Sequence, residues 1–266
     1  MSVKASLEKQ LKRWPILYRL AANAYFALKP ARWMEIAIGT KAREKEWATR
    51  HLRKGNDWGD TKHRGENDEW ALGYWDSRNH SHRPFLLEKV AAFFPFSSLL
   101  EIGCNCGPNL YLLARKFPDA EIAGIDINPE AIEKGKQLFA SEGISNVSLS
   151  VGQADRLEQF PDKSFDIVLT DAVLIYIGPD KIKKVLQEML RITRRALILL
   201  ERHRFETNGK DPQGFGIYSQ GLWIRDYVAL LKQFVPAERI SVTKLPENVW
   251  PGWEGLGAVI EVGVMR

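Results

Sequence analysis

The chain has 266 residues, of which 45% are apolar, so it is long enough to bury a full core as one α/β domain with extensions. No apolar run reaches the roughly 18 residues that a membrane-spanning helix needs, and the N-terminus lacks the pattern of a signal peptide, so we expect a cytoplasmic protein. The formal net charge of +5 is unevenly spread, because residues 1–54 contain thirteen Lys or Arg and four Asp or Glu. This basic arm predicts an anionic partner.

Residues 11–33 of the arm have apolar side chains three or four positions apart, with lysines and arginines between them. This is the pattern of an amphipathic basic helix. Two interpretations are open. Either residues 1–35 lie on an anionic membrane surface at the inner face of the membrane, with their aromatic rings at the headgroup level, or the arm packs on the body or on a second subunit.

Residues 70–84 mix aromatic, histidine and arginine side chains just before the first predicted strand. This mixture predicts a lid over a site, in which Tyr74, Trp75 and Arg78 contact a substrate. Aromatic anchors that attach an extension to the core are the alternative. We therefore divide the chain into a basic helical extension with a lid, residues 1–84, and a main domain, residues 85–266.

Residues 99–110 organise the main domain. An apolar run ends on Glu101 and passes into a turn that contains Gly103 and Gly107, after which leucines recur at helical spacing. A strand thus leads to a helix N-terminus through a loop whose backbone can approach a ligand closely. The pattern favours a nucleotide-like cofactor bound by main-chain N–H groups. A plain strand-to-helix turn is the alternative.

Strand-like segments alternate with helical ones through the main domain, which is typical of a parallel sheet with helices on both faces. After these, residues 202–220 are expected to form a loop and residues 222–234 a helix. Residues 239–244 and 257–264 are separated by only a dozen residues, too few for a helical crossover, so we expect an antiparallel hairpin at the sheet edge. The expected parallel strands are the run that ends at Glu101 and residues 121–126, 147–151, 165–171 and 196–201.

Acidic residues follow the second and third predicted strands. Asp126 lies twenty-three residues after Gly103, and that separation places its carboxylate where it can accept both hydroxyls of a ribose. Asp155 lies in a polar loop at the same edge. The only cysteines, Cys104 and Cys106, are too close for an unstrained disulfide and lack further metal ligands, so we interpret them as packing residues and predict no metal.

Four segments in this order resemble the motifs of the class I S-adenosylmethionine-dependent methyltransferases: residues 101–107, 124–126, 153–155 and 160–171. The resemblance covers roughly residues 85–266. It implies a seven-stranded, mostly parallel Rossmann-like sheet with an antiparallel C-terminal hairpin strand, S-adenosylmethionine as cofactor and S-adenosylhomocysteine as product. In this family the first loop binds the methionine end, the second-strand acid binds ribose and the third-strand acid meets the adenine amino group. The residues that it assigns to the cofactor are Glu101, Gly103, Cys104, Asn105, Gly107, Asn109, Asp126, Ile127, Asp155, Arg156, Asp171 and Tyr176.

One position departs from the family pattern. Asn105 stands where the family often has its middle glycine. Its side chain must therefore point away from the cofactor or bond to it.

Methyl transfer from a sulfonium asks the protein mainly to align the acceptor, the methyl carbon and the sulfur. An oxygen acceptor also needs a general base. His80, His82 and His203 are candidates by position, and a structural role is open for each. Asp171, at the end of the fourth strand, either orients the acceptor or caps the loop that follows it.

The acceptor class follows from a further resemblance. Residues 74–80 resemble extensions of methyltransferases that act on surface sugars, so a sugar or glycan hydroxyl is the first predicted acceptor, followed by small metabolites and lipid-like molecules. An NAD-dependent dehydrogenase shares the glycine loop and the second-strand acid, but not the acid after the third strand or the terminal hairpin. A nucleic-acid-binding or scaffolding protein with a vestigial cofactor fold is the non-enzymatic alternative. The intact motif acids and glycines argue against it, and we expect no nucleic acid partner.

Overall fold

The computed structural model describes residues 41–50, 70–211, 216–219 and 221–264. The predicted amphipathic helix over residues 11–33 lies outside these described residues. Residues 43–266 form one compact unit. None of the described helices has the length and apolar character needed to cross a bilayer.

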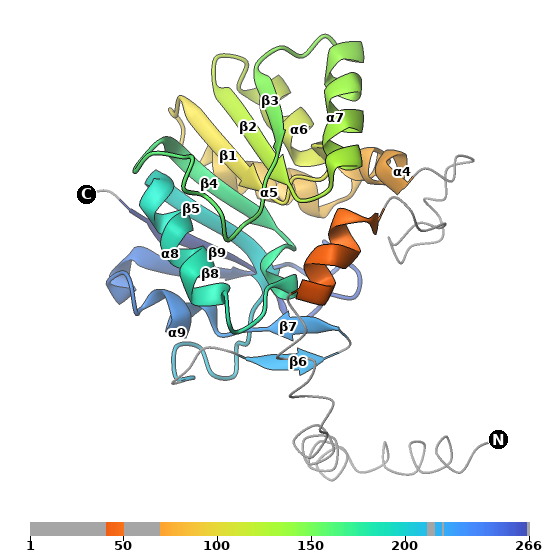
Figure 1. Ribbon diagram of the computed structural model, residues 1–266. Helices are drawn as coiled ribbons and strands as arrows, with labels where there is room; N and C mark the ends of the chain where they lie inside the picture. The colour runs from red at the N-terminus through yellow and green to blue at the C-terminus, as the bar shows by residue number, and fades with distance from the viewer. Residues whose placement is uncertain (1–40, 51–69, 212–215, 220, 265–266) are drawn as a thin grey trace, which may run out of the picture. The chain divides into compact units, whose positions relative to one another are not determined.

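A seven-stranded sheet runs through this unit (Figure 1) in the order β3-β2-β1-β4-β5-β9-β8. The strands from β3 to β5 pair in parallel. Strand β9 is antiparallel to both of its neighbours, β5 and β8, which confirms the predicted sheet and its terminal hairpin. The strands are β1 (Ser98–Ile102), β2 (Glu121–Asp126), β3 (Val147–Val151), β4 (Phe165–Asp171), β5 (Thr193–Arg202), β8 (Ile240–Lys244) and β9 (Gly257–Gly263).

Helices cover both faces of the sheet. Buried side chains of α5, α6 and α7 pack on one face, and those of α8 and α9 pack on the other. Residues 41–48 are also helical. The named helices are α4 (Trp70–Asp76), η3 (Ser77–Asn79), α5 (His82–Ala91), α6 (Pro108–Lys116), α7 (Pro129–Ser141), η4 (Leu174–Tyr176), α8 (Ile182–Ile192), α9 (Tyr227–Leu231) and η5 (Ala237–Arg239).

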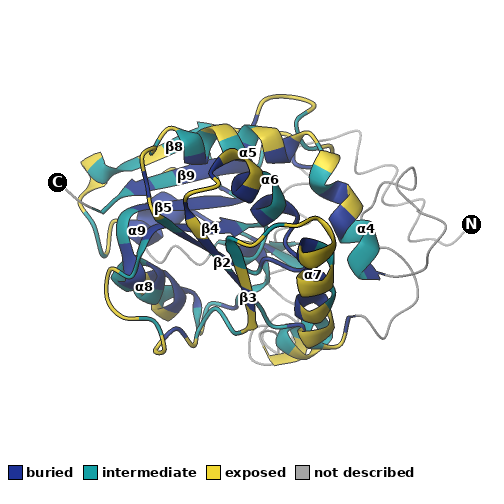
Figure 2. Ribbon diagram, turned by 90° about the horizontal axis from the view of Figure 1, so that it is seen from above, coloured by how far each residue is buried: buried dark blue, intermediate teal, exposed yellow. Residues whose placement is uncertain are grey.

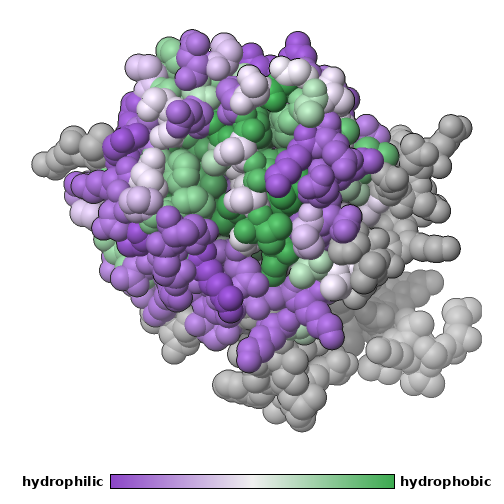
Figure 3. Space-filling model, turned by 45° about the horizontal axis from the view of Figure 1, so that its top comes forward, coloured by the Kyte–Doolittle hydropathy of each residue, from purple (hydrophilic) through white to green (hydrophobic). Residues whose placement is uncertain are grey.

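Side chains alternate between the two faces along each strand, and this alternation decides which helices each acid can reach. Leu99 and Leu169 pack with α5 and α6, so Glu101 and Asp171, two positions further on, point to that same face. Glu201 lies two positions after Leu199, which packs with α8 and α9. Figure 2 shows the central strands as buried, while α7 exposes its outer side. On the face seen in Figure 3, hydrophobic side chains lie between hydrophilic ones.

Helices α6 and α7 begin as their sequences predict. Each has proline in its first turn, where the missing N–H costs nothing. The Asn128 side chain accepts the N–H groups of Glu130 and Ala131 at the start of α7. Such N-caps fix where a helix begins and therefore where the preceding strand must end.

The helix predicted over residues 222–234 is wrong in its first part. Leu222–Ile224 form strand β7, which pairs with β6 (Ile217–Ser219) in a small antiparallel hairpin inside the predicted loop. Gly221 has a φ of +83°, which the turn requires and glycine supplies without strain. The Asp226 side chain accepts the N–H of Ala229, so α9 begins only at Tyr227.

The segment predicted as a lid is folded onto the body where the structure describes it. Trp75 is buried in the core and packs edge-on against Tyr111 and Phe139. Helix α5 begins at His82 and therefore runs across the predicted boundary between residues 84 and 85. Trp75 is thus an aromatic anchor, in line with the alternative interpretation of this segment.

Candidate active site

A cavity of about 400 Å³ opens at the carboxyl ends of β1, β2, β4 and β5, the edge where doubly wound sheets bind their ligands. Its wall includes most of the residues that the sequence assigned to a cofactor. Gly107 and Arg156 are the exceptions, because neither lies in the wall. The assigned residues that do are Glu101, Gly103, Cys104, Asn105, Asn109, Asp126, Ile127, Asp155, Asp171 and Tyr176.

The glycine loop uses its N–H groups within the protein. Gly103 and Cys104 donate to the carbonyl of Ile125, Gly107 donates to the carbonyl of Cys104, and Asn105 donates to Asp126 Oδ2. The N–H of Cys106 donates to the Asn105 side chain. The N–H groups of residues 103–107 therefore shape the turn. The cradle expected at the helix start, which lies at Pro108, stays a prediction.

Asn105 takes the conformation that a glycine would take. Its φ is +51°, in the left-handed region that asparagine tolerates better than most residues with a side chain. Its Oδ1 accepts the N–H of Cys106 at 2.7 Å. The departure from the family pattern is thus accommodated by a side chain that turns onto its own loop.

One buried amide joins the two acids at the centre of the wall. Asn109 Nδ2 donates to Glu101 Oε1 at 2.7 Å and to Asp171 Oδ2 at 2.9 Å, while its Oδ1 accepts from Arg83 at 2.7 Å. Glu101 Oε2 and Asp171 Oδ1 are buried and receive no hydrogen bond within the described part of the chain. Burial raises the pKa of Glu101 to about 8.

Asp171 has the opposite electrostatic environment. His82 Nε2 lies 3.0 Å and Arg83 Nη1 3.4 Å from its Oδ2. Burial opposes the ionisation of Asp171, but the His82 and Arg83 side chains and the amide of Asn109 outweigh it and lower its pKa to about 2. Asp171 therefore carries its charge at neutral pH.

His82 and His80 lie behind Asp171 and not in the cavity wall. Burial lowers the pKa of His82, so its ring is neutral, with Nε2–H donating to Asp171. His82 Nδ1 then accepts from Nδ1 of His80, 2.6 Å away. The His82 ring also stacks on Trp250, with ring centroids 3.9 Å apart. This arrangement makes His82 a positioning residue for Asp171.

His203 is fully buried and lies outside the wall. Its ring packs against Phe205 and Tyr227, and burial lowers its pKa. The structure therefore separates His203 from the other candidate bases and places it in the packing beneath the sheet edge.

Residues 172–177, which follow β4, are fixed by Glu201 and Arg225. Glu201 accepts the N–H groups of Val173, Leu174 and Ile175, and burial raises its pKa to about 7. Arg225 donates to the carbonyls of Leu174 and Ile177. Because Glu201 caps this loop, the capping role considered for Asp171 is wrong.

Lys181 lies between two acids of the wall. Its Nζ is 2.7 Å from Asp155 Oδ2 and also pairs with Glu44. Burial disfavours the charged form, but both carboxylates outweigh it and raise the pKa of Lys181. Asp155, predicted to meet an adenine amino group, is therefore already paired through one oxygen.

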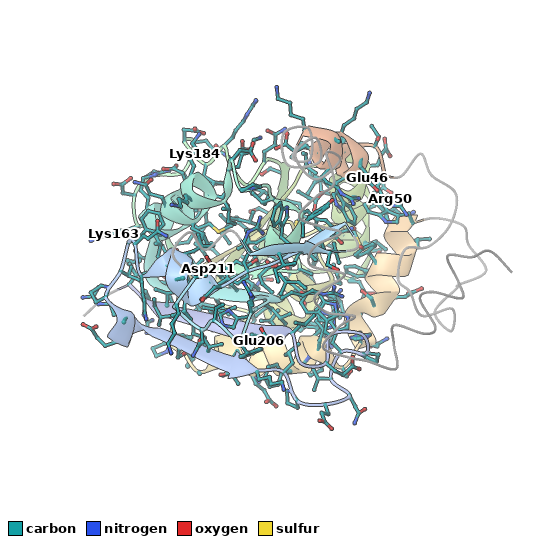
Figure 4. The ribbon with its side chains drawn as sticks, turned by 90° about the horizontal axis from the view of Figure 1, so that it is seen from below. Glu46, Arg50, Lys163, Lys184, Glu206 and Asp211 are labelled. Carbon is teal, nitrogen blue, oxygen red and sulfur yellow. The ribbon has the colours of Figure 1, made fainter. Side chains whose placement is uncertain are left out.

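Arg43, Glu44 and Trp47 contribute the N-terminal part of the wall. They belong to the segment in which Figure 4 labels Glu46 and Arg50, two residues outside the wall. The ring of Trp47 lies 4.8 Å from that of Tyr176, and the amide of Asn128 donates to the Trp47 carbonyl at 2.8 Å. The sequence pattern did not predict this contact, because it joins residues more than eighty positions apart.

The three predicted substrate residues are separated. Tyr74 lies in the wall, whereas Trp75 and Arg78 do not. The Arg78 guanidinium lies over the rings of Trp75 and Tyr111, 4.9 and 5.4 Å from their centroids. Both cysteines are buried and free, as expected for packing residues.

The sequence also missed wall residues from the C-terminal part. Arg202 ends β5 at the same edge as Asp126 and Asp171, so the rule that found the acids could have found it. Trp250 and Trp253, in the loop before β9, carried no comparable signal. The wall residues that the sequence did not assign include Arg43, Glu44, Trp47, Arg83, Arg202, Leu222, Trp250 and Trp253.

Comparison with known proteins bears on this fold. A family model described as a methyltransferase domain matches residues 99–196, from β1 into β5. This part of the chain therefore resembles a methyltransferase domain. The antiparallel β9 within the sheet agrees with this resemblance. The same strand argues against the dehydrogenase alternative, for which no terminal hairpin was expected.

Two curated relatives illustrate the range of proteins that share the methyltransferase domain. A probable chloroplastic tocopherol O-methyltransferase of Oryza sativa subsp. japonica is 32% identical over 242 residues, covering 77% of this chain and 65% of that protein. The tRNA N(3)-cytidine methyltransferase METTL6 of Homo sapiens is 28% identical over 135 residues, covering 47% of this chain and 48% of that protein. The chain spans about half the length of the first curated relatives it matches.

A solved structure shows the same fold. It is phosphoethanolamine N-methyltransferase 1 of Haemonchus contortus, determined with phosphoethanolamine and S-adenosylhomocysteine. The TM-score is 0.58 at 17% identity, and the match covers 87% of this chain and 50% of that chain.

Proposed function

We propose that this protein transfers a methyl group from S-adenosylmethionine to a hydroxyl group of a small molecule. The observation that carries the proposal is that Glu101 and Asp171 line the cavity and that each has one buried carboxylate oxygen, Oε2 and Oδ1, without a hydrogen-bond donor among the described residues. Unpaired buried carboxylate oxygens are costly, and a bound cation or donor removes that cost.

The chemistry of the wall fits this cofactor. Glu101 would bind the ammonium of the methionine end, and Asp126 would bind the ribose hydroxyls. Asp155 would lie at the adenine end. A cofactor without phosphates does not need the N–H groups of the glycine loop, which donate within the protein.

The bound cofactor would supply an electrophilic methyl group on a sulfonium. Asp171 Oδ1 would accept the hydrogen bond of the acceptor hydroxyl and so orient its oxygen. A pKa of about 2 makes Asp171 a weak base, which suffices because an oxygen that has gained a methyl group is strongly acidic. His82 and Arg83 keep the carboxylate in place throughout.

The acceptor is proposed at the level of a small hydroxyl-bearing molecule, with a sugar as the first candidate. The sugar subtype came from residues 74–80, of which only Tyr74 lies in the wall. Small metabolites and lipid-like molecules therefore belong in the same screen, and tRNA belongs there as the nucleic acid alternative.

Titration calorimetry with S-adenosylhomocysteine tests the cofactor assignment. Asp126→Asn should weaken binding by about 1.5–3 kcal/mol, because a ribose hydroxyl loses a charged acceptor. Asp119→Asn, at an exposed position outside the cavity, is the matched control and should bind like the parent protein. Unchanged affinity in Asp126→Asn, or tighter binding of NAD than of S-adenosylhomocysteine, would contradict the proposal.

We also propose that the protein is cytoplasmic and binds anionic membranes through residues 1–35, because the arm combines excess positive charge with aromatic residues. Co-sedimentation with vesicles should rise with anionic lipid, fall at high salt and disappear when residues 1–35 are deleted. Equal binding to neutral and anionic vesicles would contradict the membrane role.

A further inference from the structure

The cavity wall contains charges of both signs. Glu101, Asp126 and Asp171 come from β1, β2 and β4. Arg202 ends β5, Arg43 lies in the N-terminal segment next to Glu44, and Arg83 pairs with Asp171. The carboxylates suit a cation, which is what the proposed cofactor is. A wall cation that no carboxylate neutralises can bind the other substrate.

Within the described part of the chain, Arg202 is the wall cation without a counter-ion. No carboxylate lies within ion-pair distance of it among the described residues, in contrast to Arg43, which pairs with Glu46, and Arg83, which pairs with Asp171. Its only hydrogen-bond acceptor there is the carbonyl of Gly252, 3.3 Å from Nη2. Its Nε is buried without a partner.

Packing fixes the Arg202 guanidinium beside the cavity. It lies over the ring of Trp253 at 5.0 Å from the centroid, a contact that orients the planar group. Trp253 stacks on Trp250, with ring centroids 4.1 Å apart. Both tryptophans and Leu222 line the cavity, so the charged group stands at the edge of an apolar wall.

We propose that the methyl acceptor carries an oxyanion, a carboxylate or a phosphate, that pairs with Arg202, and an apolar body that lies against Leu222 and the edges of the Trp250 and Trp253 rings. The faces of the two rings are covered by His82, by each other and by Arg202. This inference rests on the proposed function and specifies its acceptor. A guanidinium matches both oxyanions with parallel N–H donors, and such pairs are strong where water is excluded.

The test uses three probes that share a hydroxyphenyl body: 4-hydroxybenzoate, 4-hydroxyphenyl phosphate and the neutral 4-hydroxybenzamide. Their binding to the full-length protein is measured by calorimetry or NMR titration, with and without saturating S-adenosylhomocysteine. At least one of the two anions should bind about tenfold or more tightly than the amide, and the comparison between them tells carboxylate from phosphate.

Three variants test whether Arg202 causes the preference for an anion. Arg202→Gln should reduce the affinity of the preferred anion to that of the amide, and Arg202→Lys should recover part of it, because a lysine keeps the charge but not the paired donors. Arg195→Gln, at the opposite end of the same strand and outside the cavity, should change nothing. Thermal unfolding of each variant verifies that it is folded.

The outcomes separate this inference from the proposed function. If S-adenosylhomocysteine binds but both anions bind no better than the amide, or fail to bind, the inference is overturned. Equal anion affinity in Arg202→Gln and the parent protein overturns it as well. If S-adenosylhomocysteine does not bind, the proposed function fails, while the titrations without it still report on Arg202.

Discussion

Binding of the proposed cofactor beside Glu101 should change the protonation of this carboxyl group. Burial places its pKa at about 8, so the carboxyl is mostly protonated at pH 7 in the free protein. An ammonium bound at Oε2 favours the ionised form and lowers that pKa. Binding should therefore release a proton at pH values between that lowered pKa and about 8.

This linkage gives a measurable pH dependence. S-adenosylhomocysteine should bind more tightly as the pH rises towards about 8 and level off above it, with release of close to one proton near pH 7. Calorimetry in buffers of different ionisation enthalpy measures the release. Glu101→Gln should abolish it, and proton uptake in the parent protein would contradict the assignment.

His82 offers a second prediction at the scale of a single residue. His82→Ala removes a buried donor from a charged acceptor, which should lower the free energy of unfolding by about 1.5–3 kcal/mol. His80→Ala, at a partly exposed neighbour that reaches Asp171 only through His82, should cost less. Urea unfolding of both variants makes the comparison, and equal losses would show that His82 does not position Asp171.

The loop of residues 172–177 depends on one buried carboxylate. Glu201→Ala leaves three backbone N–H groups and the hydroxyl of Thr170 without their acceptor, so unfolding should become easier by at least about 3 kcal/mol. Glu201→Gln keeps an acceptor oxygen and should lose less. Denaturant titration followed by circular dichroism tests the pair, and equal stability of Glu201→Ala and the parent protein would contradict this account.

The elements that the sequence predicted well are those whose pattern is local. Strands β2, β3 and β4 were predicted at their observed bounds, because β2 and β4 are short, mostly apolar runs between turn residues and β3 alternates apolar and polar residues. The hairpin of β6 and β7 was missed because Leu222–Phe234 is apolar at a spacing that also fits a helix. Only the positive φ of Gly221 at the turn distinguishes the hairpin from a helix.

Local patterns also decide which residues of the site could be predicted. Glu101, Asp126, Asp155 and Asp171 could be predicted because each lies at or within a few residues of the carboxyl end of a strand, and these ends define the edge. Trp250 could not, because it reaches the cavity through the long loop before β9. The Asn105 side chain accepts the N–H of Cys106 within its own loop. The sequence alone does not predict this bond, because it depends on the positive φ of Asn105.

At the scale of the whole molecule, residues 43–266 are one compact unit, which predicts where the chain tolerates truncation. Deleting residues 1–40 should leave a folded protein that binds S-adenosylhomocysteine like the full chain. Deleting residues 1–50 should weaken that binding, because Glu44 and Trp47 leave the wall. Calorimetry on both truncations tests this, and full affinity without residues 43–50 would contradict their place in the site.

A cut at residue 84 should behave differently. It removes Trp75 from the core together with His82 and Arg83, whose side chains are buried and bonded to Asp171. We expect that fragment to lose its cooperative thermal unfolding.

Asn128 has two tasks that different atoms perform. Its Oδ1 starts α7 by accepting two backbone N–H groups, and its Nδ2 donates to the carbonyl of Trp47. Aspartate in its place would keep the first task and lose the second, since it has oxygens at both positions. Asn128→Asp is therefore a separation-of-function variant. It removes the hydrogen bond to Trp47 in the N-terminal wall and keeps the cap of α7. The two contacts of position 128 therefore need both the oxygen and the nitrogen of one amide.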